Sequence, residues 1–262
     1  FDQLVSRTMT QIPVKNLQIE GLLNQGDLII VGSWIIGNVG QYEFMIIESF
    51  DAETSILTVK RGALDTIPFE WGVDTNFWNS SPDDGLFSLT EYSADQNVRV
   101  SALTVTPSSK LEQLGSVPVY MRSRAIRPYP PANVKINDGY WPAYFKDDLV
   151  ISWANRNRLQ QTGGEIIGWF DNGVTLEAGV TCQLILTEFD ENDIELVTQN
   201  ANVTAVNTFT LLASSMNVNT RKIKIILKTV RDGFECLYSF EHTVLASKLT
   251  APASVTFEVI EI

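Results

Sequence analysis

The sequence has few of the residues that usually carry chemistry. It contains one histidine, His242, and two cysteines, Cys182 and Cys236, in 262 residues. A zinc site needs three or four nitrogen or sulfur ligands, which such a set rarely supplies. His242 has no cysteine or second histidine near it in the chain, so we interpret it as an ordinary strand residue. We therefore predict no metal site and no cofactor.

The motifs of common enzyme classes are also missing. Neither Gly-x-Ser-x-Gly nor Gly-x-x-x-x-Gly-Lys-Ser/Thr occurs. Two acidic clusters, residues 81–85 and 190–193, are interpreted as turns rather than cation sites. Nothing singles out a pair of carboxylates for glycoside cleavage among the 31 acidic residues. We predict that the chain is not an enzyme and has no catalytic residue.

Positive charge and long apolar runs are scarce as well. The net charge of −12 opposes binding to phosphate groups, so we predict no nucleic-acid partner. No apolar run reaches the roughly 18 residues of a membrane span, so we predict none. The chain begins at Phe1 rather than at methionine, and we expect it to be a piece of a longer protein.

The residues that are present favour β structure. Short runs rich in Val, Ile and Thr are separated by Gly, Asn and Asp, and helical periodicity is confined to residues 108–114. Residues 42–48 and 56–60 predict a hairpin. Residues 97–105 alternate with period two, which predicts one buried and one exposed face. We predict an all-β fold.

Prolines divide the chain into two β domains. Proline rings fix φ and remove a backbone donor, so Pro128, Pro130 and Pro131 predict a stiff linker at residues 124–131. Before it, residues 1–123 predict a small β-barrel or sandwich. After it, residues 132–247 predict a seven-stranded sandwich that resembles a fibronectin type III domain. Residues 248–262 predict a strand that packs back on the first domain or leads into another domain.

Both cysteines fall in strand-like runs of the second domain. Two cysteines are too few for a disulfide scaffold, which favours buried, reduced thiols. The sequence leaves a disulfide between the two sheets open.

Aromatic residues cluster in one loop of the second domain, residues 140–145, which contains Tyr140, Trp141 and Tyr144. An exposed aromatic loop would be an interaction site, and its chemistry would suit a receptor or a carbohydrate. The alternative, which we favour, is a local core that covers one end of the sandwich. A receptor- or carbohydrate-binding module is therefore our second functional hypothesis.

Trp153, Arg156 and Arg158 form the most specific pattern of this domain. Trp153 ends a strand and is expected in the core. The two arginines lie two residues apart, on one side of an extended segment. They can pair with carboxylates such as Glu165 or Glu188, or with a neighbouring subunit, and we favour structural ion pairing.

Three motifs carry a resemblance to a known family. Residues 60–68, Lys-Arg-Gly-Ala-Leu-Asp-Thr-Ile-Pro, resemble an Arg-Gly-x-Leu-Asp-Thr-x-Pro motif found in tail proteins of long-tailed phages and prophages. Residues 122–134 resemble the Arg-x-x-Arg-Pro-Tyr-Pro-Pro join that follows it, and Trp153 with Arg156 and Arg158 resembles its Trp-x-x-Arg-x-Arg signature. The chain departs from the pattern at Trp71, where a histidine is common.

This resemblance implies a tail-tip or baseplate hub protein, of the kind also seen in gene transfer agents. It implies a virion structural role at the distal end of a phage tail, in a particle that can be prophage-encoded. The expected partners are other tail or baseplate subunits in an oligomeric particle, and a receptor or glycan on the host surface. The motifs carry over no catalytic residue.

Five residues of the first motif are expected to serve folding: Arg61, Gly62, Asp65, Thr66 and Pro68. Gly62 permits a sharp exit from the preceding strand. Asp65 and Thr66 are expected to cap nearby amides, and Arg61 to pair with a local acid. Leu64 and Ile67 are expected to plug one end of the small first domain.

Overall fold

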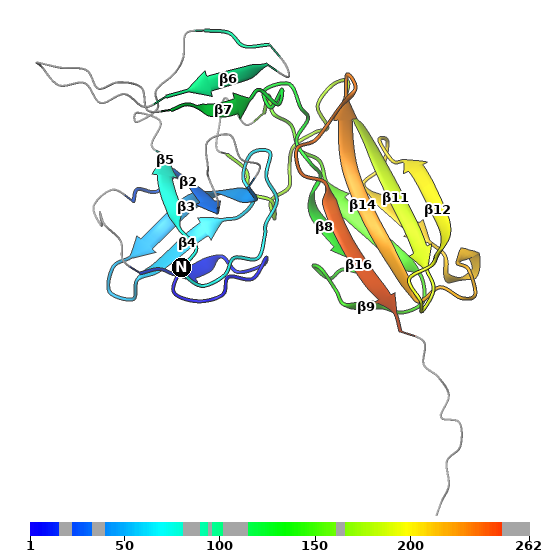
Figure 1. Ribbon diagram of the computed structural model, residues 1–262. Helices are drawn as coiled ribbons and strands as arrows, with labels where there is room; N and C mark the ends of the chain where they lie inside the picture. Colours follow the sequence, from blue (N-terminus) through cyan, green and yellow to red (C-terminus); the bar gives the residue numbers. More distant parts are fainter. Residues whose placement is uncertain are drawn as a thin grey trace, which may run out of the picture.

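In the computed structural model of the chain, the regular secondary structure is almost entirely β-strand (Figure 1). The structure describes residues 1–15, 23–32, 40–80, 90–93, 96–101, 115–160 and 166–247. Within these ranges the one helical element is a 3₁₀ turn, η3 (Ala213–Ser215). The predicted all-β class is confirmed. The expected helical turn at 108–114 and the expected final strand at 248–262 lie outside the described residues.

The first module is one antiparallel sheet. Its strands are β1 (Gln11–Pro13), β2 (Leu28–Gly32), β3 (Tyr42–Asp51), β4 (Ile56–Lys60) and β5 (Phe77–Ser80), in the order β1-β4-β3-β2-β5. The expected hairpin is confirmed, because β3 and β4 pair from Ile46 opposite Lys60 to Asp51 opposite Ile56. Apolar side chains that alternate along β2 and β4 fill one core on a face of this sheet.

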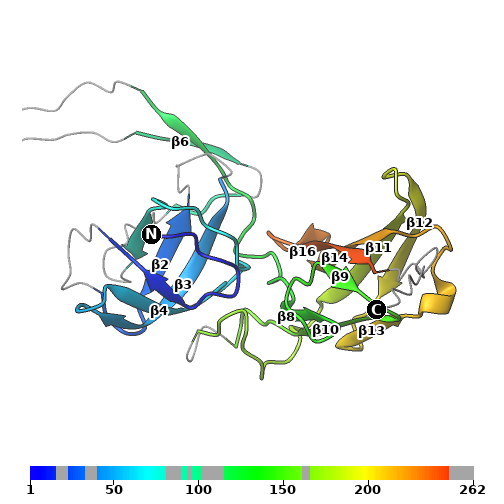
Figure 2. The same ribbon diagram turned by 90° about the horizontal axis from the view of Figure 1, so that it is seen from below.

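A separate two-stranded ribbon follows, formed by β6 (Asn97–Val100) and β7 (Val117–Tyr120). It projects past the first module in both views (Figures 1 and 2). Val100, Val117 and Tyr120 are exposed, so the alternation in residues 97–100 does not bury one face as we expected. The reason is that the ribbon's two strands pair only with each other, and no described layer covers them.

The second module, called the sandwich, packs two sheets face to face. The strands are β8 (Ala132–Ile136), β9 (Tyr144–Phe145), β10 (Leu149–Ala154), β11 (Thr181–Phe189), β12 (Glu195–Asn202), β13 (Thr208–Leu211), β14 (Lys222–Arg231), β15 (Phe234–Glu235) and β16 (Phe240–Ala246). One sheet has the order β13-β10-β8 and the other β12-β11-β14-β16-β9, with β15 beside β14. The inward residues of both sheets form one core that includes Trp153. This is the layout expected of a fibronectin-III-like sandwich.

The proline-rich segment, residues 124–131, is packed against the sandwich. Pro128, Pro130 and Pro131 are buried. Arg127 Nη1 donates to the Glu235 carbonyl at 2.8 Å. The Thr229 hydroxyl donates to the Tyr129 carbonyl at 2.7 Å. These contacts fix the segment on the surface of the second module instead of leaving it as an open spacer.

The two cysteines are free thiols on either side of one strand. Cys182 of β11 lies opposite Thr229 of β14, and the Cys236 amide donates to the Thr229 carbonyl from the other side. Two strand spacings, about 9–10 Å, therefore separate the two Cα atoms. A disulfide requires less than about 7 Å, so this pair cannot form one without moving β14.

We expect both thiols to resist modification in the folded chain. Burial raises the pKa of Cys182 to about 12 and also raises the pKa of Cys236, which suppresses the reactive thiolate. Ellman's reagent at pH 8 should detect almost no thiol in the native chain and both thiols after unfolding in urea. Detection of fewer than two thiols in the unfolded, unreduced chain would contradict the free-thiol assignment.

Candidate functional site

The residues that carry the family resemblance meet where the first module joins the sandwich. The loop after β4, residues 61–71, is called the junction loop here. Every residue from 61 to 68 except Leu64 is buried, although none lies in a strand. Buried backbone without regular structure needs hydrogen-bond partners from elsewhere in the chain. The junction is built around three such sets of partners, centred on Arg61, Asp65 and Arg156.

The first set is a buried ion pair between Arg61 and Glu43, whose side chains are both 0% exposed. Arg61 Nε donates to Glu43 Oε1 at 2.7 Å, and Nη2 donates to Oε2 at 2.9 Å. Glu43 comes from β3, 18 residues before Arg61, so the expected acid partner comes from the neighbouring strand. A two-point contact of this kind fixes both the position and the orientation of the guanidinium.

Every remaining donor of Arg61 is also satisfied. Nη1 donates to the carbonyls of Ser6 and Met9, both at 2.8 Å, and Nη2 donates to the carbonyl of Phe69 at 2.6 Å. The pair therefore connects the N-terminal segment, two strands and the junction loop. A fully satisfied polar network in a buried site specifies a single arrangement of the backbone around it.

Glu43 also accepts from three groups other than Arg61. These are the Gly62 amide at 2.9 Å, the Phe69 amide at 3.1 Å and the Trp71 indole Nε1 at 2.8 Å. Trp71, where the family motif commonly has histidine, thus supplies a ring N–H to the buried carboxylate. This contact gives a physical account of why an N–H-bearing ring suits that position.

Gly62 makes the sharp exit from β4 that the sequence predicts. Its φ is +57°, and a Cβ there would lie 2.7 Å from Pro68 Cδ and 2.8 Å from Trp169 Cβ. Both the backbone conformation and the space exclude a side chain. Pro68 is therefore part of the close packing that closes the loop. Next to this contact, the Trp169 amide donates to the Arg61 carbonyl at 2.7 Å and ties the sandwich to the junction loop.

The second set involves Asp65 and Thr66. Asp65 is 3% exposed and accepts a two-point contact from Arg124, so it forms an ion pair with the linker and not the expected amide cap. Thr66 accepts from the Phe44 amide at 3.1 Å, so its predicted capping role is confirmed. Leu64 packs against Phe44 and Ile46 of the first module, as expected. Ile67 packs into the sandwich core, whereas we expected it to close the first module. The loop thus anchors both modules.

The third set centres on Arg156, which comes from the sandwich and is 3% exposed. Its Nη2 donates to the Leu64 carbonyl at 2.7 Å, and longer contacts of 3.3 Å reach the Gly62 and Ile167 carbonyls. No carboxylate pairs with it among the described residues. Burial lowers the pKa of Arg156 to about 10, so the group is still charged at neutral pH. The cation is held by backbone dipoles across the junction.

Arg158 makes a different contact, although it lies only two residues further on. Its Nη2 and Nε donate to the two oxygens of Glu177 at 2.6 and 2.9 Å. Arg231 shares the same carboxylate at 2.6 Å. The predicted structural ion pairing is confirmed for Arg158, but with Glu177 as the partner. Glu188 instead accepts from Thr220 and from the Asn217 amide, and Glu165 lies outside the described residues.

The aromatic loop at residues 140–145 is divided between core and surface. Trp141 is half-buried and stacks on Trp169 with ring centroids 4.8 Å apart. The Tyr140 hydroxyl donates to Asn133 Oδ1 at 2.5 Å. Tyr144, by contrast, is 63% exposed. Two of the three residues thus belong to the local core that we favoured, and glycan binding by this loop stays a prediction.

His242 lies in β16 and bonds through Nε2 to the Pro142 carbonyl at 2.8 Å. Burial, with Arg7 as a nearby positive charge, lowers its pKa, so the ring is neutral at pH 7 and Nε2 is the donor. Among the described residues, no three His, Cys, Asp or Glu side chains are placed to hold a metal ion together. None of the described helical segments has the length and apolar character of a membrane span.

Three residues of the junction region were missed by sequence reasoning: Glu43, Trp169 and Glu177. Glu43 had a signal, because it is a carboxylate inside an otherwise apolar strand between Tyr42 and Phe44. Trp169 and Glu177 had none, because their partners lie far away in the chain.

Comparisons with solved structures show a structural similarity, whereas the comparisons of sequence do not. No protein-family model matches the chain, and no curated protein matches it significantly. The crystal structure of the chicken CNTN1 FN1-FN3 domains aligns with 88% of this chain at 11% identity and a TM-score of 0.30. The chain spans 59% of the length of that structure. At this TM-score the all-β fold rests on the strand pairings described above and not on the alignment.

Proposed function

We propose that this chain is a structural and interaction component of a phage tail tip or baseplate, and a piece of a larger hub or tail protein. One observation supports the proposal above the others: Arg156, from the third family motif, donates to carbonyls of the first motif across the junction. The residues that carry the resemblance therefore serve to hold two modules in one arrangement. This role suits a scaffold subunit.

The physical basis of this proposal is that the contacts restrict motion between the first module and the sandwich. Adjacent domains in one chain usually move relative to each other unless their interface is large or specifically bonded. Here the junction loop is buried, and Asp65 and Arg156 form polar contacts that depend on direction. A connector with such a junction transmits a fixed orientation from one subunit to the next, as a tail tip requires.

The ribbon formed by β6 and β7 offers a surface for such subunits. A two-stranded ribbon is marginally stable by itself in water. Val100, Val117 and Tyr120 are each more than 40% exposed on it. Neighbouring tail or baseplate subunits, in an oligomeric particle, are the partners that we propose. Contact with the host surface stays a prediction.

The proposal is tested by locating the chain in particles. Antibodies raised against the 262-residue chain would be applied with gold label to particles induced from the strain that encodes it. We expect label at the distal end of the tail and peptides of this chain in the purified particles by mass spectrometry. If the polypeptide is expressed but absent from particles that carry complete tails, the proposal is wrong.

A further inference from the structure

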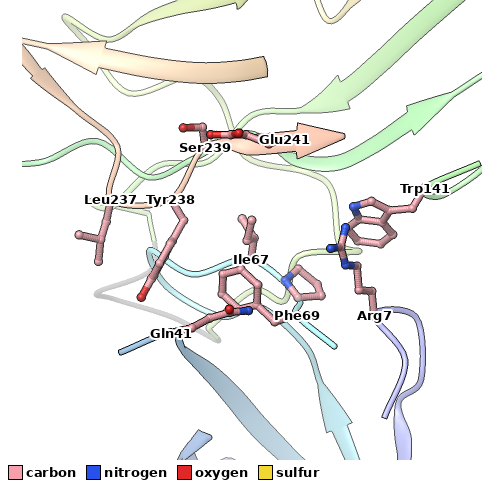
Figure 3. Close-up of a pocket in the computed structure, with 10 residues that line it drawn as sticks. Arg7, Gln41, Ile67, Phe69, Trp141, Leu237, Tyr238, Ser239 and Glu241 are labelled. Carbon is pink, nitrogen blue, oxygen red and sulfur yellow. The ribbon is translucent and has the colours of Figure 1, made fainter. Parts of the chain in front are cut away.

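A pocket of about 370 Å³ opens at the junction, between the two modules. Arg7 and Gln41 line it from the first module, Phe69 from the junction loop, and Trp141, Tyr238 and Glu241 from the sandwich (Figure 3). Pockets of this size accept small molecules such as one or two sugar units. Its walls come from segments far apart in the sequence.

The most unusual group in the pocket is the guanidinium of Arg7. Among the described residues it has no hydrogen-bond acceptor and no carboxylate partner, and its Nε atom is buried without a bond. It lies over the Trp141 ring, whose centroid is 5.4 Å from the guanidinium carbon, and its charge also acts on the nearby His242 ring, which is neutral at pH 7. Arg61, Arg124 and Arg158 pair with carboxylates, and Arg156 donates to backbone carbonyls. The donors of Arg7 have neither kind of partner among the described residues, and an anionic ligand would satisfy them.

The other polar groups of the pocket suit hydroxyl groups. Gln41 can both donate and accept, and the Glu241 carboxylate accepts. Burial, with Tyr42 nearby, raises the pKa of Tyr238 to about 12, so its phenol is protonated at neutral pH. Figure 3 shows Glu241 on the strand above the space and Arg7 beside Trp141 at one side. A ligand that fits needs one anionic group near Arg7 and several hydroxyl groups elsewhere.

Aromatic walls complete the site. Phe69 and Tyr238 meet edge to face with centroids 5.3 Å apart, and both line the pocket. Such apolar surfaces pack against the C–H faces of a sugar ring. The negative charge of Glu241 disfavours a dianion such as a phosphate monoester more than it disfavours a single carboxylate.

We propose that this pocket binds an acidic sugar, a hexuronate unit of a polysaccharide, with the sugar carboxylate on Arg7. The sugar hydroxyls meet Gln41 and Glu241, and the ring lies against Phe69 and Tyr238. This inference does not rest on the tail-tip role, because it follows from the pocket alone.

The test compares two trisaccharides of similar size on the 262-residue chain by calorimetry and by NMR titration. Trigalacturonate carries carboxylates, and maltotriose is neutral. We expect trigalacturonate to bind at least about tenfold more tightly than maltotriose, with shifts at the Trp141 indole. Added salt should weaken the binding of trigalacturonate, because the contact with Arg7 is ionic.

Two substitutions give effects of opposite sign. Arg7→Gln should weaken the binding of trigalacturonate by about tenfold or more. Glu241→Gln should tighten it, because the variant removes a negative charge from the wall. The matched control is Arg99→Gln, which removes an exposed arginine from β6, outside the pocket, and should leave the affinity unchanged.

Three results would overturn the proposal. These are no binding of trigalacturonate up to its solubility limit, equal binding of the two trisaccharides, and an unchanged affinity in Arg7→Gln. If Arg7→Gln does not fold, the test rests on Glu241→Gln, because Glu241 is exposed. An affinity for trigalacturonate no higher than that of the wild type would then overturn the proposal.

Discussion

Glu43→Gln is expected to lower the free energy of unfolding by about 3–5 kcal/mol, because it leaves the Arg61 guanidinium buried without a countercharge. Both side chains of the pair are 0% exposed, so water cannot replace the lost carboxylate. The substitution keeps the volume of the side chain, and the loss is therefore electrostatic and not a packing defect. Domains of this size have a total stability of roughly 5–15 kcal/mol, so the expected loss is a large share of it.

Urea denaturation followed by circular dichroism measures this change. The control is Lys224→Met, which removes an exposed ion pair with Glu241 at 3.4 Å and should change stability by about 0.5 kcal/mol or less. Hydrogen exchange should show first-module amides losing protection before amides of the sandwich core. Equal midpoints for Glu43→Gln and the wild-type chain would show that the pair contributes nothing.

The double variant Glu43→Leu/Arg61→Met separates this network from a simple buried pair. Replacing both members of a simple pair with apolar residues is often neutral or stabilising. Here five further groups would be left unpaired: three donors to Glu43, and the Met9 and Phe69 carbonyls that accept from Arg61. The Ser6 carbonyl keeps the Met9 amide as a donor. Each unsatisfied buried group costs about 1–3 kcal/mol. The double variant should therefore be no more stable than Glu43→Gln.

The parts of the fold that could be predicted are those set by local pattern. The hairpin of β3 and β4 follows from two apolar runs around a polar turn, and Trp153 lies in the core as its place at the end of a strand indicates. The period of two in residues 97–105 predicted a strand, and the structure has one at Asn97–Val100, while residues 102–105 lie outside the described ranges. It could not show that the strand would lack a covering layer, because burial depends on other parts of the chain.

The junction could be predicted only in part. Gly62 and its turn are local, and the backbone there explains the glycine. The contact between Arg156 and Gly62 spans 94 residues, and no local sequence pattern near either residue predicts it. Arg158 was expected to reach Glu188 or Glu165, yet Glu177 is its partner, because strand order and not sequence separation decides which carboxylate is near. Partner choice across a junction is a tertiary property.

Arg156→Met is expected to loosen the junction and to lower the free energy of unfolding by about 2–4 kcal/mol. The variant removes the donors to the carbonyls of Leu64, Gly62 and Ile167. The loss is less than the sum of three hydrogen bonds, because removing the buried charge also relieves its desolvation. Hydrogen exchange at the Trp169 amide, which donates across the junction to the Arg61 carbonyl, measures the loosening directly.

Arg158→Met is the matched control, because it removes a partly buried arginine of the same motif that bonds to Glu177 and not to the junction loop. It should destabilise the sandwich and leave the Trp169 amide protected until the sandwich itself unfolds. The free energy of unfolding of Arg156→Lys should lie between those of the wild type and Arg156→Met. The lysine ammonium keeps the charge, but it cannot donate to several carbonyls at once as the planar guanidinium does.

The pH dependence of the wild-type chain adds a separate check on Arg156. Burial lowers the pKa of Arg156 in the folded chain to about 10, so the unfolded chain holds this proton more tightly. The contribution of Arg156 to the free energy of unfolding therefore rises with pH only above about pH 10. Near neutral pH the stability difference between the wild type and Arg156→Met should therefore be independent of pH. If Arg156→Met leaves the Trp169 amide as protected as in the wild type, the two modules are held together by packing alone, and the arginine has no role in their orientation.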